Sequence, residues 1–152
     1  MKLIYLDIDG VLNAHQYSQG ALSCLVDKGH VDLLNEVLAI GAEIVISSAW
    51  RYMILEGSMS LQGFEYMLRT HGVHCPRRVV GLTGRDPPHF PEDGAKIRSA
   101  LILKDVEERK PKKWVAVDDL KLLLPRQNFV MTDGLKGLRR HDVHKMIAKL
   151  SS

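Results

Sequence analysis

Two aspartates, Asp7 and Asp9, close a short apolar run near the start of the chain, in the segment LDIDGVLN. In an extended chain alternate residues point to the same side, so both carboxylates project together while Ile8 points away. A second acidic pair, Asp118 and Asp119, ends another apolar run, KWVAVDD. Carboxylates brought together repel one another unless their pKa values rise or a cation binds. These residues therefore indicate a cation site, a carboxylate reaction, or both.

The chemistry that suits such a cluster is phosphoryl transfer with Mg²⁺. Hard oxygen ligands without His or Cys in the motif favour Mg²⁺ over zinc, and the expected metal ligands are Asp7, Asp9, Asp118 and Asp119. A carboxylate beside the metal can attack phosphorus to form an aspartyl-phosphate, because the metal neutralises charge on both anions. Asp9 is placed to protonate the leaving oxygen and then to deprotonate the attacking water. Asp7 is then the nucleophile.

A serine and a lysine complete this predicted catalytic set. Ser47 ends a third apolar run, EIVISS, and its hydroxyl can donate a hydrogen bond to a phosphoryl oxygen. Lys96 follows Gly94 near the start of a predicted helix. Its ammonium group can balance the negative charge that Mg²⁺ does not neutralise. The alternative for Lys96 is an ordinary solvated lysine on a helix surface, as for the lysines of ERKPKK.

The periodicity of apolar residues predicts elements that would bring these side chains together. Strands are expected over residues 2–8, 43–50, 77–84, 113–119 and 128–133, and helices over residues 30–42, 61–72, 95–110 and 139–150. Strands alternating with helices favour an α/β fold with a parallel sheet and right-handed crossovers. Ligands bind beyond the carboxyl ends of such strands, where Asp7, Ser47 and Asp118 fall. The alternative is that each is only a strand-end turn residue.

Length and composition limit the class of protein. With 152 residues, of which 45% are hydrophobic and 26% charged, the chain is expected to form one globular domain over residues 1–152. A formal net charge of +3 tolerates an anionic substrate but falls short of a dedicated nucleic-acid binder. Cys24 and Cys75 form no CxxC pair, and no apolar run reaches membrane-spanning length. We therefore expect a cytoplasmic protein with free thiols and no membrane partner.

The segments DIDGVL, VISS and VAVDD, with Lys96 between the last two, resemble in order the four motifs of the haloacid dehalogenase (HAD) superfamily of aspartate-dependent phosphohydrolases. The resemblance implies a three-layer α/β/α Rossmann-like fold around a central parallel five-stranded sheet. It supports Asp7 as nucleophile, Asp9 as acid and base, and Mg²⁺ as cofactor. Of the second acidic pair, family usage favours Asp118 over Asp119 as the direct metal ligand.

The resemblance also implies a short flap insert at about residues 13–29. Because this insert and the segment at residues 85–94 are too short to form a domain with its own core, no cap domain is expected. SSAWR and a late GL resemble a small phosphatase-like domain found in some RNA-repair proteins. There Trp50 and Arg51 could meet substrate; alternatively Trp50 packs beneath the loop and Arg51 makes a structural hydrogen bond. The expected substrate-binding residues are Gly10, Ser48 and Arg51.

The resulting functional prediction is a Mg²⁺-dependent phosphohydrolase with an open site that could take a nucleic-acid end or a phosphoprotein. Arg85, His89 and the last helix are further candidates for substrate contact. One alternative is a regulatory or binding module that keeps the fold without turnover. Another is a small-molecule phosphatase whose site is closed by oligomerisation. A phosphorelay receiver domain is disfavoured, because here the D-x-D pair comes first and the adjacent acidic pair last.

Overall fold

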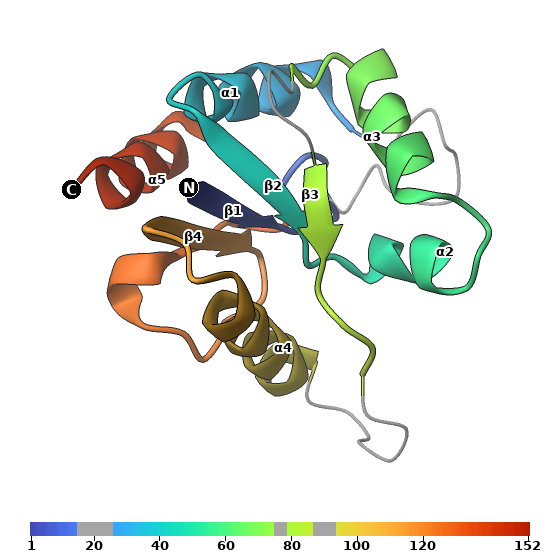
Figure 1. The fold of residues 1–152 in the computed structure, drawn as a ribbon. Coiled ribbons are helices and arrows are strands. Elements are labelled where there is room, and N and C mark those ends of the chain that lie inside the picture. Colours follow the sequence, from blue (N-terminus) through green and yellow to red (C-terminus); the bar gives the residue numbers. More distant parts are fainter. Residues whose placement is uncertain (15–25, 75–78, 87–93) are drawn as a thin grey trace.

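Five parallel strands form the central sheet in the computed structural model, which describes residues 1–14, 26–74, 79–86 and 94–152 (Figure 1). Their order across the described sheet is β3-β2-β1-β4-β5. The strands are β1 (Lys2–Leu6), β2 (Ala42–Ile46), β3 (Val79–Leu82), β4 (Lys113–Asp118) and β5 (Phe129–Met131). The predicted parallel five-stranded sheet is confirmed.

Helices cover both faces of this sheet and give the predicted three layers (Figure 1). On one face α1 (Lys28–Leu38), α3 (Leu61–Thr70) and α5 (Arg140–Ser151) contribute to the larger hydrophobic core. On the other face α4 (Gly94–Arg109) packs through Ile102 on a smaller cluster with Leu122, from the chain that follows β4. No helix in the described ranges is long and apolar enough to cross a membrane.

The central strand β1 explains why its sequence reads as an almost unbroken apolar run. Ile4 and Leu6 face the larger core, whereas Leu3 and Tyr5 face the α4 side, and all four are fully buried. A strand covered on both faces has no reason to alternate apolar with polar residues. Polar residues become possible only where the strand leaves the sheet, which is where Asp7 lies.

Helix α1 begins and ends by recognisable local chemistry. The Asp27 side chain accepts a hydrogen bond from Gly29 N at 2.8 Å and caps the first turn. The helix ends at Leu38, earlier than predicted, and Ile40 lies beyond it. Gly41 follows with φ +86°, a backbone conformation that residues with a side chain rarely adopt.

The end of the second strand differs from the sequence prediction, which extends this strand to Trp50. The ladder of β2 ends at Ile46, and a 3₁₀ turn, η3 (Ala49–Arg51), leads into α2 (Tyr52–Leu55). The Ser48 side chain accepts a hydrogen bond from Trp50 N at 3.2 Å and so caps this turn. A second 3₁₀ turn, η4 (Arg126–Asn128), precedes β5.

Several sequence predictions fall on residues outside the described ranges. The expected flap insert at residues 13–29 is one of them, because residues 15–25 are not described. Its last residues, from Lys28, already belong to α1. Cys24, Cys75 and His89 also lie outside the described residues.

Candidate active site

Four polar residues form a row across the sheet at the carboxyl ends of its strands. The ladders pair Leu6 with both Ile46 and Val117, and pair Ile46 with Leu82. The row consists of the next residue of each strand, namely Thr83, Ser47, Asp7 and Asp118. Ladder-type hydrogen bonds continue into it, from Asp7 N to Val117 O at 3.1 Å and from Ser47 N to Leu6 O at 3.1 Å.

The alternation of side chains sets the face on which this row lies. Tyr5, Val45 and Ala116 belong to the cluster on the α4 side of the sheet. Asp7, Ser47 and Asp118 each come two residues later, so they share that face. Parallel pairing therefore gathers residues that are far apart in the sequence beneath the first turns of α4.

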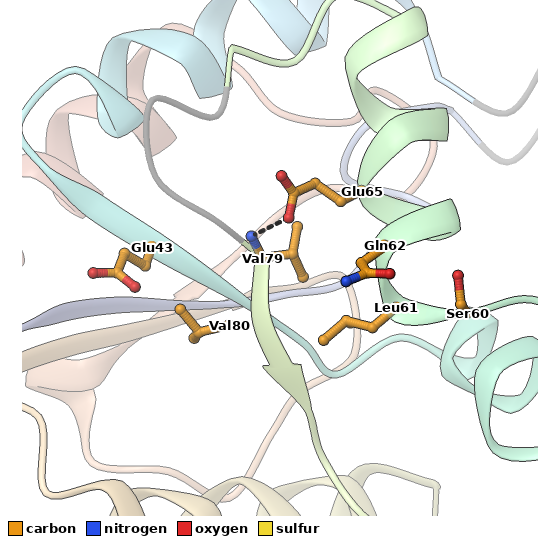
Figure 2. Close-up of a pocket in the computed structure, with 7 residues that line it drawn as sticks. All are labelled: Glu43, Ser60, Leu61, Gln62, Glu65, Val79 and Val80. Atoms are coloured by element: carbon orange, nitrogen blue, oxygen red, sulfur yellow. Dashed lines mark hydrogen bonds between the residues drawn. The ribbon is translucent and has the colours of Figure 1, made fainter.

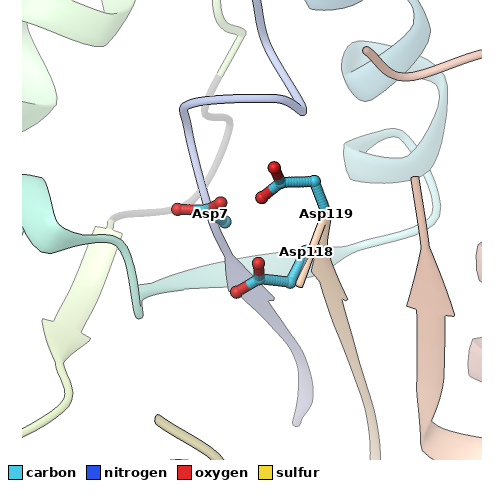
Figure 3. A group of neighbouring side chains, drawn as sticks. All are labelled: Asp7, Asp118 and Asp119. Atoms are coloured by element: carbon cyan, nitrogen blue, oxygen red, sulfur yellow. The ribbon is translucent and has the colours of Figure 1, made fainter. Parts of the chain in front are cut away.

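Three carboxylates meet at the centre of this edge. One oxygen from each of Asp7, Asp118 and Asp119 can be chosen so that all three lie within 4.8 Å of one another. Figure 3 shows Asp118 and Asp119 reaching from the end of β4 toward Asp7 at the end of β1. Asp7 is 3% exposed and Asp118 is fully buried, whereas Asp119 is half-buried.

Arg98 supplies a positive charge to this cluster from helix α4. Its Nη1 donates to Asp118 Oδ2 at 2.7 Å and lies 3.4 Å from Asp7 Oδ1. Asp118 Oδ1 accepts a further hydrogen bond from Leu120 N at 2.9 Å. One guanidinium therefore lies against the two most buried carboxylates of the edge.

Burial is the largest influence on the pKa values of Asp7 and Asp118. Desolvation, together with the charge of Asp118, holds the pKa of Asp7 well above its usual range, although Arg98 acts in the opposite direction. Burial also raises the pKa of Asp118, against the lowering effect of Arg98. For Arg98 itself burial disfavours the charge, but the two carboxylates more than offset it and raise its pKa. For both carboxylates the effect of burial therefore outweighs the lowering of the pKa by Arg98.

Gly10 allows Asp119 to approach the chain that follows Asp7. Gly10 has φ +82°, and a Cβ atom placed there would lie 2.6 Å from the Asp119 Cγ. Its N–H donates to Asn13 Oδ1 at 2.9 Å, and its carbonyl accepts from Thr132 Oγ1 at 2.7 Å. Gly10 was predicted to bind substrate, and here both its main-chain groups are engaged within the protein.

Asp9 lies outside the group of three carboxylates, although it was predicted to be a metal ligand. Its Oδ2 accepts from Trp50 Nε1 at 2.9 Å, and its Oδ1 accepts from Asn13 Nδ2 at 3.1 Å. Among the described residues, the group whose oxygens converge on one point contains Asp7, Asp118 and Asp119. The structure thus places the Asp9 side chain outside this group.

Two hydroxyls in the row have no hydrogen-bond partner within the described parts of the chain. They are Ser47 Oγ and Thr83 Oγ1, and each residue is 1% exposed. A buried hydroxyl without a partner is costly, and such groups often mark a binding site. Ser47 was predicted to contact a phosphoryl oxygen, and its location beside Asp7 is compatible with that role. Thr83 was not predicted.

Ser48 and Arg51, predicted to bind substrate, have structural partners here. Ser48 Oγ caps the η3 turn. Arg51 is 2% exposed, and its guanidinium donates to Ser48 O at 3.1 Å, to Gly84 O at 2.9 Å and to Asp86 Oδ1 at 2.7 Å. These contacts fit the alternative in which Arg51 makes structural hydrogen bonds. They join the ends of β2 and β3.

Lys96 and Arg98 occupy different faces of α4. Lys96 is exposed, whereas Arg98 lies on the inward stripe with Ser99 and Ile102. Inward positions on a helix recur every three or four residues, so the position four residues before the buried Ile102 faces the sheet. That phase of the helix is the signal in the sequence that could have identified Arg98.

A pocket of about 500 Å³ lies elsewhere, at the outer edge of the sheet beside α3 (Figure 2). None of the predicted site residues lines it. Glu65 Oε2 accepts there from Val79 N, the first residue of the edge strand, at 3.1 Å. Its lining consists of Glu43, Ser60, Leu61, Gln62, Glu65, Val79 and Val80. The cluster of Asp7, Asp118 and Asp119 lies instead at the carboxyl ends of the strands.

The residues at this edge fit a Mg²⁺ ion. Asp7, Asp118 and Asp119 offer only oxygen ligands, as Mg²⁺ prefers. The raised pKa values of Asp7 and Asp118 indicate that their charges are not fully compensated by Arg98. A divalent cation would relieve that repulsion.

The fold and this acidic edge define a HAD-type α/β domain, and comparison with protein families assigns it more closely. A family model described as the HAD domain in Swiss Army Knife RNA repair proteins matches residues 3–143. The chain belongs to this family, which makes it a phosphatase-like domain of the HAD superfamily of hydrolases. The suspected resemblance is confirmed. Searches of curated proteins and of solved structures gave no match.

Proposed function

We propose that this protein hydrolyses phosphomonoesters through a phosphoryl group carried on Asp7. The observation that carries the proposal is the buried Asp7 carboxylate, which shares one edge with Asp118 and Asp119 while Asp9 is held apart from them. This arrangement provides one carboxylate for attack on phosphorus and another for proton transfer. Membership of the HAD family supports the same reaction class.

Asp7, Asp118 and Asp119 would hold the Mg²⁺ ion, which when bound supplies positive charge that lets a carboxylate approach a phosphoryl group. The Asp9 side chain, predicted as a fourth ligand, is assigned to proton transfer in this proposal.

In the first step an Asp7 oxygen attacks phosphorus and the ester P–O bond breaks. Asp9 in its acid form gives a proton to the leaving oxygen, which departs as an alcohol. In the second step Asp9 takes a proton from water, the water oxygen bonds to phosphorus, and the bond between phosphorus and Asp7 breaks. Inorganic phosphate is released, and Asp7 and Asp9 return to their starting states.

Two further residues act on the phosphoryl oxygens. The Ser47 hydroxyl is next to Asp7 in the row, and it has no partner within the described chain, so it is available to donate a hydrogen bond. For the positive charge the sequence favours Lys96, and Arg98 is a second candidate because its Nη1 lies 2.7 Å from Asp118 Oδ2 and 3.4 Å from Asp7 Oδ1. We assign the charge to Arg98.

The proposed substrate is a phosphorylated RNA end. Support comes from the family description, which refers to RNA repair proteins, and from the short connections after β1 and β3. The connections after β1 and β3, residues 7–27 and 83–93, are each too short for an independent core, which requires about 40 residues. A bulky substrate could then approach the sheet edge.

A phosphatase screen tests this function. The purified protein with Mg²⁺ is incubated with oligoribonucleotides carrying a 3′- or 5′-phosphate, phosphopeptides, mononucleotides and sugar phosphates, and released phosphate is measured. We expect one of the phosphorylated RNA ends to give the highest kcat/KM. If a small sugar phosphate or nucleotide is turned over a hundredfold better than any oligonucleotide, the proposed substrate is wrong. Absence of Mg²⁺-dependent turnover on every ester would contradict the proposed reaction.

A further inference from the structure

The side chain of Asp9 is held by two hydrogen-bond donors from different parts of the chain. Trp50 Nε1 donates to Oδ2 at 2.9 Å, from a turn 41 residues away in the sequence, and Asn13 Nδ2 donates to Oδ1 at 3.1 Å. Asn13 Oδ1 in turn accepts from Gly10 N at 2.9 Å. Both oxygens of Asp9 are therefore fixed in direction.

Trp50, which makes this contact with Asp9, is itself held in place by other contacts. Its backbone N–H donates to Ser48 Oγ, and its half-buried ring packs against the larger hydrophobic core. The neighbouring Arg51 joins the same turn to Gly84 and Asp86 through its guanidinium. A donor on a hydrogen-bonded turn keeps its direction, which a donor on a flexible surface side chain would not do.

The chemistry of the indole group makes this contact directional. An indole N–H can only donate, so the Asp9 oxygen that faces Trp50 must act as an acceptor. Rotation of the carboxylate toward Asp7, Asp118 and Asp119 would break this bond and also the bond from Asn13. The contact thus favours an Asp9 orientation outside the cluster of three carboxylates.

We propose that Trp50 is a positioning residue, which orients Asp9 for proton transfer to the leaving oxygen and from water. This inference rests on the proposed phosphohydrolase reaction. Trp50 itself touches neither the phosphoryl group nor the metal in this role. Its contribution is to hold the Asp9 carboxylate in one direction before substrate arrives, because small errors in the placement of a proton donor are costly.

A spectroscopic experiment tests the contact without relying on catalysis. The chain has two tryptophans, so a ¹⁵N-labelled sample gives two indole N–H resonances, which Trp114→Phe assigns. Trp114 lies on β4, with its ring edge-on to Tyr5, and serves as the internal control. We expect Asp9→Ala to move the Trp50 indole resonance and to leave that of Trp114 in place. An unmoved Trp50 resonance would overturn the inference.

A kinetic experiment tests the role. Trp50→Phe keeps an aromatic ring but removes the donor, and Trp114→Phe is the matched control. For each variant kcat/KM, which reports steps up to the first phosphoryl transfer, is measured on an alkyl phosphate and on an aryl phosphate. An aryl leaving group needs little protonation, so its reaction depends less on a well-oriented acid.

We expect Trp50→Phe to lower kcat/KM about tenfold to a hundredfold on the alkyl ester, which is part of the roughly 10²- to 10⁴-fold that proton-transfer catalysis supplies, and much less on the aryl ester. Trp114→Phe should change neither. Equal losses on both esters, or no loss, would overturn the positioning role even if the wild type is active. If the wild type hydrolyses neither these two esters nor any ester of the phosphatase screen, the proposed function itself fails and the inference fails with it. The indole experiment uses Trp50 intact, so it still decides the contact if Trp50→Phe does not fold.

Discussion

Arg98 Nη1 donates to the buried Asp118 Oδ2 at 2.7 Å, which places a guanidinium at the point where the carboxylates of β1 and β4 meet. Only 15% of the Arg98 side chain is exposed. Removal of one partner from a buried ion pair leaves the other charge without compensation, which is more costly than loss of the pair as a whole. Substitutions of Arg98 and of Lys96, both near the start of α4, are therefore expected to have different effects.

Arg98→Met should destabilise the metal-free protein by about 3 kcal/mol at neutral pH, because Asp118 and Asp7 lose their counter-charge. Lys96→Met, at an exposed position of α4, should cost less, because an exposed charge interaction contributes only about 0–1 kcal/mol. Urea denaturation measures both. Steady-state assays then separate their catalytic roles, and we expect Arg98→Met to lose more turnover. A greater loss for Lys96→Met would restore the sequence-based assignment.

Asp7→Asn should abolish turnover and leave the fold intact, because the amide cannot attack phosphorus. It should raise the stability of the metal-free protein by roughly 1 kcal/mol at neutral pH, a typical single-site effect. Removal of a carboxylate whose pKa is raised by burial and by Asp118 relieves a destabilising charge. Circular dichroism and thermal unfolding without metal provide the measurement. A less stable Asp7→Asn variant would argue against crowding at this edge.

The same raised pKa values predict how stability depends on pH. The folded metal-free protein binds protons at Asp7 and Asp118 more tightly than the unfolded chain does. The free energy of unfolding should therefore fall as pH rises from about 4, the unfolded value, through the raised folded values. Asp7→Asn has no such proton to lose at residue 7, so its advantage over the wild type should grow across this window. Parallel stability curves for the two proteins would contradict the shift.

Mg²⁺ should raise the melting temperature of the wild type, because it binds only the native state. Asp118→Ala removes an oxygen ligand, whereas Lys96→Ala removes none. The thermal shift should therefore be smaller in Asp118→Ala than in Lys96→Ala at equal Mg²⁺ concentration. Differential scanning fluorimetry with and without EDTA gives the comparison. Equal shifts in the two variants would overturn Asp118 as a metal ligand.

Gly10→Ala tests the close approach of Asp119. Its Cβ would lie 2.6 Å from Asp119 Cγ, in addition to the cost of φ +82° for a residue with a side chain. Gly41→Ala is a matched control, because Gly41 has φ +86° and nothing within 4 Å of the added Cβ. We expect Gly41→Ala to cost about 1 kcal/mol, from backbone conformation alone. Gly10→Ala should cost more and should also weaken Mg²⁺ binding by calorimetry; equal costs with unchanged binding would contradict the steric argument.

The sheet and the row across its edge could be predicted from the sequence for one physical reason. Apolar runs such as KLIYL identify strands buried on both faces, and parallel strands place their carboxyl ends at the same edge. The residues that follow these runs, Asp7, Ser47 and Asp118, must then lie near one another. No side-chain detail is needed for that step.

The contacts of Trp50 and Arg98 could not be predicted in the same way. The bond from Trp50 to Asp9 depends on the 3₁₀ turn after Ser48, where apolar residues had favoured a longer strand. The assignment of Lys96 rested on its place near the start of a helix, without the phase of that helix. That phase, set by the burial of Ile102, turns Arg98 inward and Lys96 outward.

The most direct measurement of the central claim is to trap the phosphoryl group on Asp7. The protein is mixed with Mg²⁺ and a phosphorylated RNA end, quenched with acid within one turnover, digested, and analysed by mass spectrometry. We predict one added phosphoryl group on the peptide that contains Asp7 and no phosphorylated peptide from Asp7→Asn. Turnover by the wild type with no phosphoryl group on that peptide, or more than a few per cent of activity in Asp7→Asn, would contradict the account.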